Sequence, residues 1–208
     1  MMGFYDRRIL PKLIDSACGT KPTRRQREKV VPQAEGRVLE IGIGSGLNLP
    51  HYDAARVTHL FGLEPSPEMR QIATERVGQL RFPFEFIDLP GEEIPLETDS
   101  VDTVVTTFTL CTIPDAHTAL EGMRRVLKPG GRLLFCEHGE APDAGVLKWQ
   151  NRINPVWQKI GGGCNLNRRI FTLIEEAGFT LEQADSMYLP GTPRVFGFNY
   201  WGVARIAG

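Results

Sequence analysis

The chain of 208 residues lacks any run of about 18 consecutive apolar residues, the length needed to cross a bilayer. Its first residues, MMGFYDRRILPKL, also lack the apolar centre of a secretory signal peptide. We therefore expect a cytoplasmic protein with no integral membrane segment.

Cysteine is scarce. The four cysteines are Cys18, Cys111, Cys136 and Cys164, and no two of them form a C-x-x-C pair. This spacing supports neither a metal-ligand motif nor a disulfide framework. The sequence predicts reduced thiols and no bound metal.

An excess of charge of either sign is also missing, because the formal net charge is −1. A nucleic-acid-binding domain usually carries a strongly basic face, so we do not expect a nucleic-acid partner. Basic residues do gather between Lys21 and Lys29, but Glu28 interrupts them. We expect a solvated helix face there.

Segments typical of strands alternate with segments typical of helices, with no repeat or linker. This order predicts an α/β fold: a single Rossmann-like, doubly wound sheet, mostly parallel, with helices on both faces. Seven strands are expected, the last two forming a C-terminal antiparallel hairpin. They are Val38–Ile41, Thr58–Leu63, Phe82–Ile87, Val101–Val105, Arg132–Cys136, Phe179–Tyr188 and Arg194–Arg205.

Among the helices, we expect one over Phe4–Ala17 with a break near Pro11 and one starting at Thr23 as its N-cap. Ser66 and Asp115 are expected N-caps, and Gly178 is expected to close a helix over Asn167–Ala177. Two further helices are predicted over Leu47–Ala55 and over Trp149–Ile160, the latter interrupted at Pro155. One domain over residues 1–208 would then comprise a helical lid (1–35), a cofactor-binding core (36–140), a substrate-side excursion (141–166) and a closing helix and hairpin (167–208).

The segment Arg37–Pro50, RVLEIGIGSGLNLP, joins a buried strand to a glycine-rich turn. Such a turn lets a ligand lie against bare backbone. The dinucleotide fingerprint G-x-G-x-x-G would need a third glycine at Leu47. The pattern present is instead Glu40-x-Gly42-x-Gly44-x-Gly46. Glu64 ends the second strand, where an acidic side chain reaches ribose hydroxyls in doubly wound sheets.

Four stretches resemble the class I S-adenosylmethionine (SAM) methyltransferases of the type 11, UbiE-like group. They are LEIGIGSG, GLEPS at Gly62–Ser66, DSVDTVV at Asp99–Val105 and RRVLKPGGRLLFCEH at Arg124–His138. More narrowly, Leu110-Cys111, Trp149-Gln150 and Gly163-Cys164-Asn165-Leu166 are similar to the branch of thiol S-methyltransferases. Those relatives are membrane-associated through an apolar N-terminal anchor that this sequence does not show, so we do not transfer their location.

The resemblance implies SAM as cofactor, with S-adenosylhomocysteine as its product. The matching cofactor-binding residues are Glu40, Gly42, Gly44, Gly46, Asn48, Glu64, Pro65, Ser66, Met69, Gly91, Glu92, Thr109 and Leu110. The family's Gly-Asp-Ala-Glu loop, whose acidic residue binds the adenine amine, corresponds here to Leu89-Pro90-Gly91-Glu92. We expect that contact to be lost, or to pass to Glu92 or backbone.

The resemblance also implies in-line methyl transfer to a small apolar acceptor, with a thiol as the first candidate. His138 follows the fifth strand and is the candidate base. Tyr5, Cys111, Trp149 and Cys164 are expected to line the substrate side.

Several alternatives remain open at this stage. The acceptor could be a quinone, a phenol or a lipid amine, and the chain could be a SAM-binding module without turnover. A nicotinamide-dependent oxidoreductase is a further alternative, against which Leu47 argues. The oligomeric state is not predicted.

Overall fold

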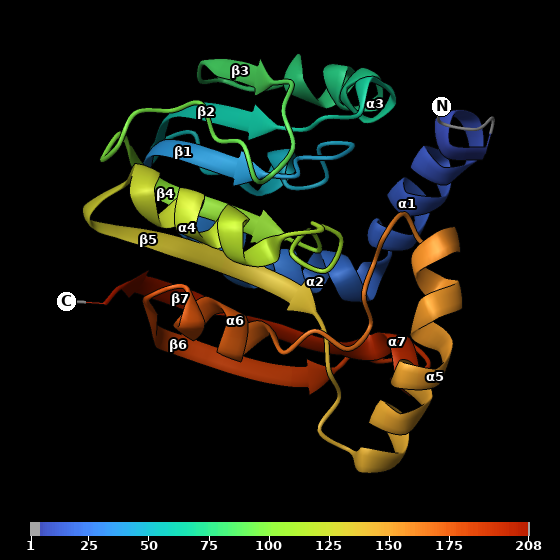
Figure 1. Ribbon diagram of the computed structural model, residues 1–208. Helices are drawn as coiled ribbons and strands as arrows, with labels where there is room; N and C mark the ends of the chain where they lie inside the picture. Colours follow the sequence, from blue (N-terminus) through green and yellow to red (C-terminus); the bar gives the residue numbers. More distant parts are fainter. Residues whose placement is uncertain (1–4, 208) are drawn as a thin grey trace.

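A computed structural model describes residues 5–207 and shows a seven-stranded sheet with strand order β3-β2-β1-β4-β5-β7-β6 (Figure 1). The strands are β1 (Gly36–Ile41), β2 (Val57–Leu63), β3 (Phe84–Ile87), β4 (Val101–Thr107), β5 (Leu127–His138), β6 (Phe179–Tyr188) and β7 (Phe198–Ile206).

Strands β1 to β5 run parallel, whereas β7 lies antiparallel between β5 and β6. The predicted α/β class and antiparallel C-terminal hairpin are thus confirmed. The last strand begins at Phe198 rather than Arg194, because Arg194–Gly197 forms the short helix α7. The pairing of His138 with Asn199 places the start of β7 beside the end of β5.

Helices cover both faces of the sheet (Figure 1). On one face, α4 (Ala116–Val126) and α6 (Ile170–Glu176) pack against each other and against the strands. On the other, α2 (Lys21–Val30) packs on β5 and β7. The helix α3 (Pro67–Val77) follows β2, with the Ser66 side chain accepting from the backbone of Met69 as predicted.

Two helices lie beyond the carboxyl ends of the parallel strands (Figure 1). They are α1 (Leu10–Cys18), preceded by the short π-helix η1 (Tyr5–Ile9), and α5 (Ala144–Ile160). The Tyr5 hydroxyl donates to the carbonyl of Ile160 at 2.9 Å, which ties the two helices together. Phe4, the predicted start of the first helix, lies outside the described residues. None of the described helices is long and apolar enough to span a membrane.

Three predicted helix details are wrong. Only a single 3-10 turn, η3 (Leu49–His51), follows the glycine turn, since Pro50 lacks the N–H that a longer helix needs. Thr20, not Thr23, precedes α2, and Thr23 instead donates to the carbonyls of Cys18 and Thr20. Pro155 does not interrupt α5; it is exposed there, so water can bond the carbonyl that its missing N–H leaves free.

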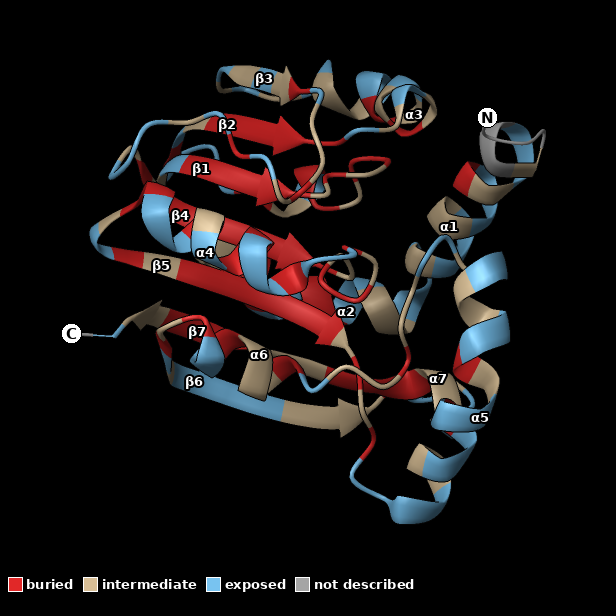
Figure 2. Ribbon diagram, in the orientation of Figure 1, coloured by how far each residue is buried: buried red, intermediate tan, exposed pale blue. Residues whose placement is uncertain are grey.

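The core lies on both sides of the central strands, which are buried along most of their length (Figure 2). Leu39 and Phe135 belong to the cluster under α4 and α6. Val38 and Leu134 belong to the cluster on the other face. Neighbouring residues of one strand pack into opposite clusters, so both faces of the sheet are buried. The carboxyl ends of the parallel strands are therefore held in fixed positions.

Candidate functional site

A narrow crevice of about 60 Å³ opens at the carboxyl ends of β1 and β4. Gly42 and Gly44 form one wall, with φ angles of +66° and +57° that favour glycine. A Cβ at Gly42 would lie 2.3 Å from the Thr109 side chain. The glycine turn therefore packs tightly against the loop after β4 and exposes backbone to the crevice.

Glu64 stands at the tip of β2, where the sequence predicts it. Its Oε2 accepts from the Gly44 amide at 3.0 Å, and its Oε1 accepts from the Ser66 amide at 2.9 Å. Burial raises the pKa of this carboxyl, and the two backbone hydrogen bonds partly offset that effect. Each oxygen keeps a further lone pair with which to accept from a ligand hydroxyl.

Glu40 has a different role from Glu64, because its buried carboxylate holds the glycine loop. It accepts from Asn48 Nδ2 at 2.8 Å and from the Tyr52 hydroxyl at 2.7 Å. Burial raises the pKa of Glu40 to about 7. Asn48 Oδ1 is buried without a hydrogen-bond partner.

Arg27 of α2 also lines the crevice, although its neighbours Arg25 and Glu28 are exposed. Its guanidinium donates to the carbonyl of Cys18 at 2.7 Å and stacks on the Phe108 ring. Its Nε is buried without a partner. The predicted solvated helix face is therefore wrong for this residue, which offers the crevice a cation and a free donor.

The loop after β4 is fixed by Glu137, a buried residue near the end of β5. Its carboxylate accepts from the Thr109 amide at 2.8 Å and from the Thr106 hydroxyl at 2.8 Å. Phe108, between them, has a φ of +54°, a strained conformation for a side chain of this size. The carboxylate compensates for that strain and places Thr109 against Gly42.

Cys111, His138 and Cys164 meet beside this loop. His138 Nε2 lies 3.2 Å from Cys164 Sγ, which lies 3.8 Å from Cys111 Sγ. The contact with Cys111 and the neighbouring imidazole lower the pKa of Cys164 to about 4. Burial lowers the pKa of His138, but Cys164 more than offsets this, so the net shift is upward.

The crevice brings together only part of the predicted cofactor set: Glu40, Gly42, Gly44, Asn48, Met69 and Thr109 line it. Gly46 packs near Leu49, and Gly91 packs against Ile113. Glu92 accepts from the Asp115 amide at the start of α4. Four further members neighbour the lining residues without being part of the wall: Glu64, Pro65, Ser66 and Leu110. Glu64 contacts the wall through the Gly44 amide.

Two predicted substrate residues lie apart from the three-residue cluster. Trp149 of α5 is 56% exposed, with Arg152 near its ring. Tyr5 bonds the far end of the same helix. The geometry unites only Cys111, His138 and Cys164 from the predicted catalytic and substrate-side residues.

Asp88, which directly follows β3, was missed at the sequence level. It forms an ion pair with Arg70, whose guanidinium also donates to the carbonyl of Glu64 at 2.7 Å. An acidic residue immediately after the third strand was the available signal.

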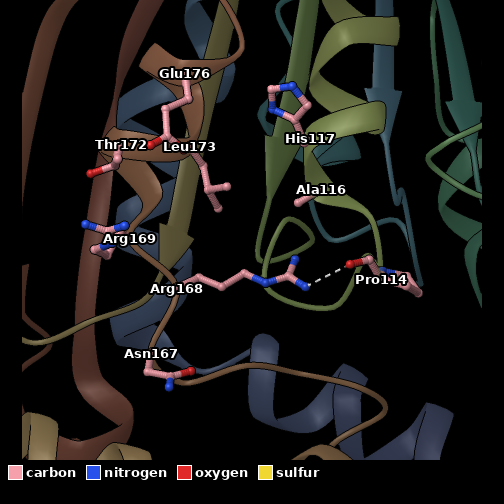
Figure 3. Close-up of a pocket in the computed structure, with 9 residues that line it drawn as sticks. All are labelled: Pro114, Ala116, His117, Asn167, Arg168, Arg169, Thr172, Leu173 and Glu176. Carbon is pink, nitrogen blue, oxygen red and sulfur yellow. Dashed lines mark hydrogen bonds between the residues drawn. The ribbon is translucent and has the colours of Figure 1, made fainter.

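A second hollow of about 260 Å³ lies between the start of α4 and α6 (Figure 3). Arg168 reaches across it to the carbonyls of Pro114 and Leu110. This contact supports the loop that carries Cys111, in addition to the hydrogen bonds of Glu137.

Comparison with known proteins agrees with this geometry. Residues 39–135 match the family model described as a methyltransferase domain. The chain is 35% identical over 176 residues to human thiol S-methyltransferase TMT1B, covering 79% of this chain and 71% of that protein. It is 33% identical over 126 residues to phosphatidylethanolamine N-methyltransferase of Cereibacter sphaeroides, covering 60% and 61%.

The fold has close structural counterparts. A putative methyltransferase from Bacillus halodurans superposes with a TM-score of 0.71 at 14% identity, covering 88% of this chain and 98% of that one. A SAM-dependent methyltransferase from Thermotoga maritima gives 0.68 at 19% identity, covering 97% of both chains. These matches remove the nicotinamide alternative. The chain belongs to the class I SAM-dependent methyltransferases.

Proposed function

We propose that this enzyme methylates small, apolar thiols with SAM as the methyl donor. The observation that carries the choice of acceptor is the 35% identity with a thiol S-methyltransferase over 79% of the chain. That match extends beyond the methyltransferase domain at residues 39–135. The cluster of Cys111, His138 and Cys164, at the end of β5 and in the neighbouring loops, supports the proposal.

The crevice and the strand ends beside it fit the proposed cofactor. Glu64 offers free lone pairs to ribose hydroxyls, and the Gly42–Gly44 backbone leaves room for close approach. Arg27 has a buried, unpartnered donor suited to the carboxylate of an amino-acid moiety. Asp88, at the tip of the neighbouring strand, is our candidate for the adenine side. When bound, SAM supplies a methyl group already activated by a sulfonium.

The protein's task is then to position the acceptor and to remove its proton. As the acceptor sulfur bonded to the methyl carbon, the electron pair of the breaking methyl–sulfonium bond would stay on the departing thioether. We assign the acceptor's proton to the pair of Cys164 and His138, whose Sγ and Nε2 atoms lie 3.2 Å apart. Positioning is the larger contribution, because a general base typically supplies about 10²- to 10⁴-fold.

We further propose that α1, within the predicted lid of residues 1–35, is the part that moves, because α2 packs on β5 and β7. Ile14 and Cys18 of α1 line the crevice, whose cavity volume is about 60 Å³. Displacement of α1 would enlarge the crevice and expose Arg27. Because the Tyr5 hydroxyl bonds the Ile160 carbonyl of α5, the same movement would also displace part of the excursion 141–166.

The test is incubation of the purified full chain with SAM carrying a labelled methyl group and a panel of acceptors. The panel holds alkyl and aryl thiols together with the phenol and amine of the same carbon skeleton, a demethylated quinol and phosphatidylethanolamine vesicles. Mass spectrometry of methylated product and S-adenosylhomocysteine should show the highest kcat/KM for the thiols. Preferential methylation of amine, phenol or quinol would overturn the choice of acceptor. Tight SAM binding without any turnover would instead support the silent binding module.

A further inference from the structure

Three potential metal ligands lie close together in the described part of the chain, although they belong to no metal-ligand sequence motif. Cys111 lies in the loop after β4, His138 ends β5 and Cys164 lies in the loop after α5. Their ligand atoms, two Sγ and one imidazole nitrogen, all lie within 4.8 Å of one another. Sulfur and imidazole together are the donors that Zn²⁺ prefers in proteins.

The two distances that involve Cys164 are close to those of a tetrahedral ion. With Zn–S bonds of about 2.3 Å, two sulfur ligands of a tetrahedral site lie about 3.8 Å apart. The Cys111–Cys164 sulfur separation is 3.8 Å. With a Zn–N bond of about 2.0 Å, sulfur and nitrogen lie about 3.5 Å apart. The Cys164–His138 distance is 3.2 Å, so a shift of the imidazole by a few tenths of an ångström would suffice.

The surroundings hold the two sulfur-bearing loops in place. The Asn165 amide donates to the carbonyl of Cys111 at 2.8 Å, and Asn165 Nδ2 donates to the same oxygen at 3.0 Å. Two thiolates and a neutral imidazole would balance the charge of a divalent ion. A neutral assembly suits this poorly solvated position, where Cys111 is buried.

We propose that Cys111, His138 and Cys164 bind Zn²⁺, and that the open fourth position takes the sulfur of the acceptor thiol. Three protein ligands with one open position are typical of catalytic zinc sites. The cluster borders the crevice, since Cys111 follows Thr109, which lines the crevice, by two positions in the same loop. The second half of this proposal rests on the proposed thiol acceptor. Zinc lowers the pKa of a bound thiol, whose proton then leaves to solvent. His138 in the zinc-loaded enzyme is accordingly a ligand, and the base role above belongs to the metal-free chain.

The first test measures metal binding without catalysis. The full chain is stripped with a chelator and titrated with Co²⁺, whose thiolate complexes show charge-transfer bands and strong tetrahedral d–d bands. One Co²⁺ per chain with both features, displaced by Zn²⁺, is expected. C111S, C164S and H138N should each weaken binding by more than about 100-fold, because changes outside the ligand shell alone cost about 10- to 100-fold. The matched control C18S should bind as the wild type does.

Circular dichroism and SAM titration of each variant show whether it is folded. A folded wild type that binds Co²⁺ no better than H138N would overturn the metal site. So would a cobalt complex without thiolate charge-transfer bands.

The second test concerns the fourth position. An acceptor thiol should shift the bands of the cobalt-loaded protein, whereas the alcohol of the same carbon skeleton should not. Unchanged bands with a thiol that the enzyme methylates would overturn the acceptor half of the proposal. A cobalt site with sulfur ligands and no thiol methylation would refute the proposed function while leaving the metal site standing.

Discussion

The carboxylate of Glu137 accepts the backbone N–H of Thr109 at 2.8 Å across the gap between β5 and the loop after β4. This bond holds Phe108 in its left-handed conformation and presents the next turn of the loop, with Cys111, to His138. The buried carboxylate of Glu137 thus supports the loop that carries Cys111.

Replacing Glu137 with Gln should destabilise the protein by about 1–3 kcal/mol, because the amide retains only one acceptor oxygen and buries an unpaired NH₂ group. Urea unfolding followed by far-ultraviolet circular dichroism measures the change. The matched control is Glu182→Gln, an exposed residue paired with Arg205, which should change stability by no more than about 0.5 kcal/mol. Equal effects of the two substitutions would contradict the supporting role.

Replacing Glu64 with Ala should weaken SAM binding by about 10- to 100-fold, since hydrogen bonds to a charged group contribute about 1.5–3 kcal/mol. The Gly44 and Ser66 amides would also lose their acceptor. Isothermal titration calorimetry measures the affinity. Glu75→Ala, exposed on the following helix, serves as control and should bind normally. Wild-type affinity in Glu64→Ala would remove the ribose contact from the proposal.

Replacing Arg27 with Met should also weaken SAM binding by about 10-fold or more, through loss of a charge-assisted donor inside the crevice. Arg25→Met, two residues earlier on the exposed side of α2, should leave the affinity unchanged. A larger loss for S-adenosylhomocysteine than for 5′-methylthioadenosine, which lacks the amino-acid moiety, would locate the contact. Equal losses for both ligands would place Arg27 elsewhere.

Glu40 makes stability depend on pH in a defined direction. Its pKa is raised from 4.5 to about 7 in the folded chain, so the folded state retains a proton that the unfolded state releases. The stabilisation is complete below pH 4.5 and is lost as the pH rises through about 7, with a total of at most about 3 kcal/mol. Unfolding free energies of wild type and Glu40→Gln, measured at several pH values, isolate this effect by difference. A difference that does not change with pH would show that Glu40 is ionised in the fold.

The fold could be predicted because its signals are local. The glycine turn, the acid at Glu64 and the caps at Ser66 and Asp115 each depend on residues within one turn or one strand end. The errors arose where tertiary contacts override local preference. Arg27 lies on a helix whose charge pattern resembles a solvated face, yet its side chain turns under α1 into the crevice.

The cluster of Cys111, His138 and Cys164 also depends on tertiary contacts that the sequence pattern does not reveal. Cys111 and Cys164 are 53 positions apart, and His138 lies 26 positions before Cys164. No spacing rule relates them, because their meeting depends on the parallel pairing of β4 with β5 and on the return of the chain after α5. The proximity of Cys111, His138 and Cys164 therefore follows from the three-dimensional arrangement of the sheet and its loops, and not from the sequence pattern.

The antiparallel insertion of β7 beside β5 has a consequence for biosynthesis. Until Phe198–Ile206 leaves the ribosome, the outer edge of β5 has no neighbour, and its backbone donors and acceptors remain open to pairing with another chain. Asn199, which donates to the carbonyl of Glu137, arrives with that same strand. The nascent polypeptide thus completes this side of the sheet only after β7 has been translated, and a ribosome that stops before this strand releases a product prone to aggregation.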